Sequence, residues 1–71
     1  MILEKALVKY NEKKEYDYTI ESKFMNFETI KEIKTYINNN IEKDIEYFIY
    51  NSEKDIEKYE CIESVICNNL L

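Results

Sequence analysis

The sequence predicts one small α+β domain over residues 1–71, in the order strand, strand, helix, strand, helix. Polar and apolar side chains alternate over residues 15–24, which is typical of a half-buried strand. From Phe27 the apolar residues instead recur every three or four positions, as one face of a helix requires. A chain of 71 residues is also too short for a second core. We therefore expect a three-stranded antiparallel sheet with two helices on one face.

The first two strands should form a β-hairpin. Leu3 and Leu7 alternate with lysines in the strand expected over residues 2–10, and the polar run 11–14 separates this strand from the next. Asn11 can help the chain to reverse, because asparagine tolerates left-handed backbone angles. One face of the second strand should carry the side chains of Tyr16, Tyr18, Ile20, Ser22 and Phe24.

The first helix should present Phe27, Ile30, Ile33, Ile37 and Ile41 to the core. Two starts are open, because Asn26 can cap the first amides, whereas Thr29 and Glu32 form a capping box one turn later. The run Asn38-Asn39-Asn40 combines modest helix propensity with an accessible left-handed conformation. We expect the helix to end there.

Residues 44–50 fit both a strand and a helical face, but their β-branched and aromatic residues favour a strand. Since both faces of that strand carry apolar residues, one face should be available to a helix, a second copy or a target. Ser52 and Asp55 then form a capping box. The helix that follows should bury Ile56, Tyr59, Ile62, Ile66 and Leu70.

The composition excludes many chemical functions, because the chain has no Gly, Pro, His, Arg, Gln or Trp. Glycine-rich phosphate loops, imidazole bases, histidine metal sites and arginine clamps are all excluded. An AT-rich coding sequence explains much of this bias. Cys61 and Cys67 lack the spacing of a zinc site and are expected to be buried free thiols. We expect a non-enzymatic, cytoplasmic protein without cofactor, metal or membrane segment.

The charge is strongly asymmetric along the chain. Residues 1–41 carry seven acids and seven lysines, whereas residues 42–71 carry eight acids and three lysines, so the net charge of −5 lies entirely in the last 30 residues. On the predicted last helix, Glu53, Glu57 and Glu60 share one side and Glu63 flanks it. These acids either form a solvated face that keeps the protein soluble or a negative surface that complements a basic groove. The same charge disfavours direct binding of DNA or RNA.

The seven tyrosines form the second feature, and four or five of them should be in the core. Tyr36 and Tyr50 are the candidates to lie outside it. An exposed tyrosine is a good interface anchor because it supplies a large contact area at low entropic cost.

A short, acidic, tyrosine-rich chain with AT-rich codon usage and no catalytic residues resembles the small anti-CRISPR and anti-defence proteins of phages. The resemblance covers the whole chain in composition and charge and involves no motif. It implies an inhibitor that blocks the basic nucleic-acid groove of a host defence protein in the host cytoplasm. The resemblance assigns no residue a role. From the charge distribution and the tyrosines, the residues predicted to bind the partner are Glu42, Asp44, Glu46, Tyr50, Glu53, Glu57, Glu60 and Glu63. The alternative is an assembly module that forms homodimers or larger oligomers through an exposed apolar strand or through Leu70-Leu71.

Overall fold

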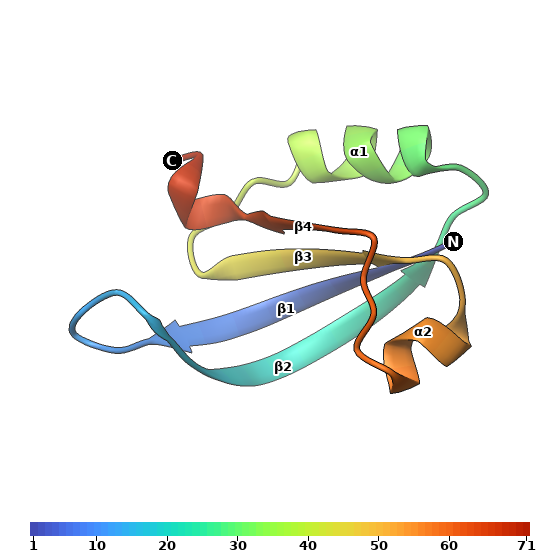
Figure 1. Cartoon of the computed structure of the whole chain (residues 1–71). Coiled ribbons are helices and arrows are strands. Elements are labelled where there is room, and N and C mark those ends of the chain that lie inside the picture. Colours follow the sequence, from blue (N-terminus) through green and yellow to red (C-terminus); the bar gives the residue numbers. More distant parts are fainter.

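The computed structural model describes residues 1–71 and contains a four-stranded antiparallel sheet, with strand order β2-β1-β3-β4, and two helices (Figure 1). The elements in chain order are β1 (Ile2–Tyr10), β2 (Tyr16–Asn26), α1 (Ile30–Asn38), β3 (Ile45–Tyr50), α2 (Glu53–Glu57), β4 (Glu63–Ile66) and a 3₁₀ turn (Cys67–Asn69). The α+β class is confirmed. The prediction of three strands is wrong, because residues 63–66 form a fourth strand.

The predicted hairpin is formed by β1 and β2, and Asn11 organises its turn through its side chain. The Asn11 Oδ1 atom accepts hydrogen bonds from the backbone amides of Lys13 at 2.9 Å and Glu15 at 3.0 Å. The left-handed residue is Lys14, with φ of 62°, and not Asn11. These side-chain hydrogen bonds add to the two backbone hydrogen bonds that close the turn, from the Lys14 amide to the Asn11 carbonyl and from the Asn11 amide to the Glu15 carbonyl, both at 2.9 Å.

Helix α1 covers one face of the sheet and forms the core with it. Thr29 is the N-cap, because its Oγ1 accepts the Glu32 amide at 3.3 Å. The helix ends at Asn38, in the predicted asparagine run. Ile33 and Ile37 are buried against a cluster from the facing strands and the 3₁₀ turn, namely Leu3, Ile45, Tyr47, Ile49 and Cys67. This apolar cluster is the main source of stability, since each fully buried aliphatic side chain contributes about 1.5–3 kcal/mol.

Tyr47 lies at the centre of this core with no exposed surface. Its hydroxyl donates a hydrogen bond of 2.7 Å to the backbone carbonyl of Asn40, just beyond the end of α1. Its ring meets the Tyr36 ring edge-on, with centroids 6.3 Å apart. The phenol therefore ties the end of α1 to the sheet. Tyr36 is half-buried in this contact and does not project as a free anchor.

The predicted long C-terminal helix is wrong, because α2 stops after Glu57. Its end is a Schellman motif: the Glu60 amide bonds the Asp55 carbonyl at 2.9 Å, and the Tyr59 amide bonds the Ile56 carbonyl at 3.1 Å. Tyr59 takes the left-handed position, with φ of 56°, that glycine usually occupies. The chain therefore leaves the helix where the apolar spacing alone would continue it.

The following residues form β4 because the edge of β3 offers backbone partners. Val65 pairs with Tyr47 and Ile66 with Glu46, which places Val65 against the core. Cys67, next in the chain, is fully buried. By contrast, Tyr59, Ile62 and Leu70, which the helical pattern assigned to the core, are 89%, 48% and 61% exposed. Pairing with β3 and the burial of Val65 and Cys67 therefore stabilise the strand more than a continued helix would be stabilised by its apolar spacing. A continued helix would also leave this edge of β3 unpaired.

The two helices do not share one face of the sheet as a covering layer. In Figure 1, α1 and α2 lie on opposite sides of the strands, and α2 has no buried residue.

The predicted apolar face of β2 is wrong as well, since Tyr16, Tyr18, Ile20 and Phe24 are all more than half exposed. Register shifts between Leu7 and Val8 and between Lys9 and Tyr10 interrupt the alternation along this edge strand. Neither helix is long and apolar enough to span a bilayer.

Candidate functional site

The acidic residues that were predicted to form one partner-binding surface do not all lie together in the structure. Glu53 and Glu57 are exposed on α2, and Glu60 is exposed in the segment that follows. Glu63 belongs to β4, where its carboxylate pairs with Lys34 at 3.2 Å. Because the chain leaves the helix at Tyr59, Glu60 and Glu63 do not continue a helical stripe from Glu53 and Glu57.

Two predicted contacts with a partner are buried. Tyr50 is 5% exposed, and its hydroxyl donates a 3.0 Å hydrogen bond to Glu4 Oε1. It is a packed residue and not a projecting anchor. Glu46 is 8% exposed, because it lies in the centre of the sheet between β1 and β4. The β-branched and aromatic content of residues 44–50 predicted the strand, but it could not show that this strand would lie between two others, with β1 paired along one edge and β4 along the other.

Glu42 and Asp44 precede β3 and have different environments. Glu42 is exposed and pairs with Lys5 Nζ at 3.3 Å, an exposed ion pair that contributes little to stability. The Asp44 backbone is left-handed, with φ of 65°, and its amide donates to Asn68 Oδ1 at 2.8 Å. Asn68 Nδ2 in turn donates to Asp44 Oδ1 at 3.2 Å. This reciprocal pair fixes the start of β3 against the 3₁₀ turn.

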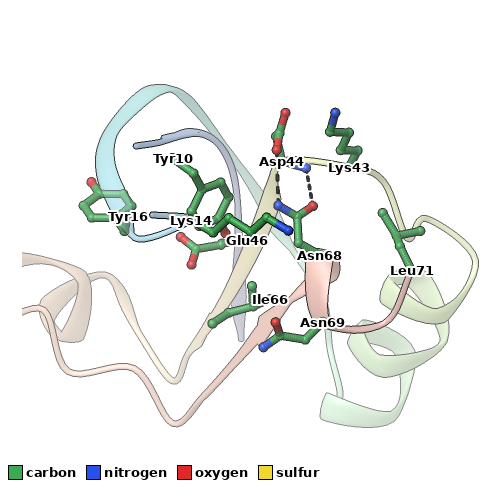
Figure 2. Close-up of a pocket in the computed structure, with 10 residues that line it drawn as sticks. All are labelled: Tyr10, Lys14, Tyr16, Lys43, Asp44, Glu46, Ile66, Asn68, Asn69 and Leu71. Carbon is green, nitrogen blue, oxygen red and sulfur yellow. Dashed lines mark hydrogen bonds between the residues drawn. The ribbon is translucent and has the colours of Figure 1, made fainter. Parts of the chain in front are cut away.

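A pocket of about 650 Å³ opens beside this pair (Figure 2). Its lining residues come from the ends of β1 and β4, from the hairpin turn, from the start of β2 and β3 and from the C-terminal segment. They are Tyr10, Lys14, Tyr16, Lys43, Asp44, Glu46, Ile66, Asn68, Asn69 and Leu71. The pocket therefore combines two carboxylates, two lysines, two phenols and two amides with aliphatic side chains.

Tyr10 and Glu46 lie side by side in this pocket (Figure 2). Burial raises the pKa of the Tyr10 phenol above its usual value, and the neighbouring Glu46 carboxylate raises it further. The phenol oxygen is buried and makes no well-formed hydrogen bond within the protein. Such an orphaned polar atom is uncommon in folded proteins and costs stability unless it meets a partner.

Sequence reasoning selected Asp44 and Glu46 but missed Tyr10, Asn68 and the pocket that joins them. The pocket exists only because β4 pairs with β3 and brings residues 66–71 beside the hairpin turn. A helix over residues 52–70 would have placed Asn68 elsewhere. The short β-branched run Val65-Ile66 was the one local signal for this strand.

The structure contains no group of three or more Cys, Asp or Glu side chains that could hold a metal ion. Cys61 is exposed and Cys67 is buried, and both are free thiols. The expectation of two buried thiols is therefore correct only for Cys67. Comparison of the chain with protein families, curated proteins and solved structures gives no match.

Proposed function

We propose that this protein is a non-enzymatic inhibitor that binds a basic, nucleic-acid-handling protein of a host defence system, as anti-CRISPR proteins do. The observation that supports the proposal is the state of Glu53, Glu57 and Glu60. All three are exposed, and none forms an ion pair or a side-chain hydrogen bond within the chain. We name these three residues the acidic segment.

The carboxylates of the acidic segment form no contact that stabilises the fold and are therefore free to bind a partner. Only two lysines, Lys54 and Lys58, lie between Glu53 and Glu60 in the sequence. The acidic segment belongs to residues 42–71, which carry the whole net charge of −5. A negative surface of this kind accelerates encounter with a basic groove and selects against neutral or acidic partners. It also repels nucleic acid, so the inhibitor would compete with DNA or RNA and not bind them.

The test is a triple charge reversal with a matched control. Glu53→Lys, Glu57→Lys and Glu60→Lys together should abolish capture of the host protein from a lysate and leave the far-ultraviolet circular dichroism unchanged. The control reverses Glu12, Glu15 and Glu28, which are exposed acids in the neutral half of the chain. Both triple variants change the net charge equally. Equal capture by the two variants would show that the acidic segment is not the binding surface.

A second candidate function, self-assembly, is favoured by the exposed apolar residues of β2. This strand is an unpaired sheet edge of 11 residues, and Tyr16, Tyr18, Ile20 and Phe24 are each more than half exposed along it. A second copy of the chain could pair its own β2 antiparallel to this edge and cover these side chains, forming a symmetric dimer. The occupant of the edge would then be the same strand of another molecule.

Sedimentation at several protein concentrations separates the two candidates. Self-assembly predicts a dimer that persists in high salt, because apolar burial and backbone pairing are not screened as exposed charges are. Ile20→Lys should abolish this dimer, since a lysine on an edge strand opposes pairing. A monomer at all concentrations would exclude assembly through β2.

A further inference from the structure

We infer that the pocket beside Glu46 and Tyr10 binds an organic cation, that is, a guanidinium or primary ammonium group on a short aliphatic stem. The pocket is distinct from the acidic segment, so this inference does not depend on the proposed function. The cation could be a free amine or guanidine, or an arginine or lysine side chain of a protein. The shared chemistry is a positive group that donates several hydrogen bonds.

The first argument is the missing countercharge of Glu46. This side chain is 8% exposed, yet the two ion pairs of the chain are Lys5–Glu42 and Lys34–Glu63, so no lysine ammonium lies within 4.0 Å of it. A buried carboxylate is unfavourable unless an opposite charge or several donors compensate it. A ligand cation would supply both.

The second argument is the hydroxyl of Tyr10, which lies beside the same carboxylate. Its oxygen is buried next to Glu46 but makes no well-formed hydrogen bond with it. If the phenol turns its proton toward Glu46, the carboxylate gains one donor but no countercharge. The phenol oxygen then still has free acceptor capacity, which an N–H group of the same cation can fill. Glu46 and Tyr10 together are therefore better matched by a cation with several N–H donors than by a cation without such donors.

The neighbouring charges define where the cation can lie. Lys14 and Lys43 line the same pocket, and they repel a cation placed near them. Asp44 also lines it, but its carboxylate already accepts a hydrogen bond from Asn68. Glu46 is thus the lining carboxylate without a well-formed hydrogen bond from another residue, although the Tyr10 hydroxyl lies next to it. The positive group should therefore lie against Glu46, beside Tyr10.

The walls of the pocket suit an aliphatic stem. Tyr16, Ile66 and Leu71 line it together with the polar groups, and each of these three residues has more than a third of its surface exposed. The volume of about 650 Å³ lies within the range of about 300–1,000 Å³ that small-molecule sites have. A stem of three or four methylenes could cover part of this apolar surface while its charged end reaches Glu46.

The test uses n-butylguanidine and its uncharged isostere n-butylurea as probes in an NMR titration of the whole chain. n-Butylguanidine should shift the Tyr10 ring and Glu46 carboxyl signals to saturation, and n-butylurea should not. Glu46→Gln should weaken binding at least tenfold, whereas Tyr10→Phe should weaken it by a smaller factor. Lys14→Met should strengthen binding, because it removes a like charge. The control Glu28→Gln, on an exposed residue outside the pocket, should change nothing.

Three results would overturn the inference: equal shifts with both probes, no saturation below about 20 mM, or shifts that survive Glu46→Gln unchanged. The two-probe comparison on the unmodified chain needs no variant to fold. A blocked tripeptide with a central arginine identifies the source of the cation. Binding of this peptide as tight as that of n-butylguanidine assigns the pocket to a protein side chain. Binding of n-butylguanidine alone assigns it to a free guanidine or amine.

Discussion

Replacing Tyr47 with phenylalanine should destabilise the protein by about 1.5 kcal/mol, because the change removes one buried hydrogen bond and leaves one buried acceptor. The Tyr47 hydroxyl donates to the Asn40 carbonyl at 2.7 Å, and the residue has no exposed surface. Since the ring itself is retained, no cavity larger than an oxygen atom forms. The loss therefore measures how strongly the phenol holds the end of α1 on the sheet.

For a domain of this size, such a loss lowers the melting temperature by roughly 6–12 °C. Thermal unfolding followed by circular dichroism measures it, with Tyr59→Phe as the matched control. Tyr59 is 89% exposed, so the control should stay within about 0.5 kcal/mol of the unmodified protein. If Tyr47→Phe is as stable as Tyr59→Phe, the hydrogen bond does not hold α1 on the sheet and the reasoning is refuted.

Three further predictions concern stability and access. Burial and the hydrogen bond to Glu4 raise the pKa of Tyr50 to about 12, and burial also raises the pKa of Tyr47. The unfolded chain therefore loses these protons first, at about pH 10, so stability should be constant below that pH and fall toward pH 12. Tyr50 alone should account for a loss of up to about 2–3 kcal/mol, and Tyr47 should add to it. Urea midpoints of the unmodified chain and Tyr50→Phe measure this, and an equal loss in both would contradict it. Cys61 should react with a thiol reagent in the native protein and Cys67 only after unfolding, since Cys67 has no exposed surface; equal rates would contradict the fold. Ile37→Ala should cost about 2–5 kcal/mol, but Ile62→Ala under about 1 kcal/mol, and a similar cost at both sites would restore the long C-terminal helix.

The order of strands and helix in the first 50 residues could be predicted from local pattern, because local signals and long-range packing agree on these elements. The step from alternation to a three- or four-residue spacing at Phe27 marks the change from hairpin to α1. The Thr29 cap and the asparagine run mark the two ends of α1 correctly. Residues 45–50 were ambiguous by spacing, but their β-branched and aromatic content gave the correct strand.

The last 20 residues could not be predicted in the same way, because their structure depends on a distant partner. Residues 63–66 pair with the edge of β3 and so become part of the sheet. They do so although Ile56, Tyr59, Ile62 and Ile66 have the spacing of one helical face. With no glycine in the chain, Tyr59 forms the left-handed helix end, which no sequence rule would assign to a tyrosine. The burial of Glu46 and Tyr50 follows from the same strand order and was equally out of reach.

The charge asymmetry could be read directly from the sequence, since counting acids and lysines needs no fold. What the structure adds is the separation of these acids by environment. Glu53, Glu57 and Glu60 are free and exposed, Glu42 and Glu63 are paired, and Glu46 is buried. The predicted single surface of seven acids therefore becomes an exposed segment and a separate pocket.

Competition with nucleic acid tests the proposed inhibitor most directly. The host protein captured by the immobilised chain should be displaced when duplex DNA, or the guide RNA of the captured effector, is added in excess. The dissociation constant of the pair should also rise with salt, because exposed carboxylates facing a basic groove are screened. Capture that is indifferent to both nucleic acid and salt would contradict the account.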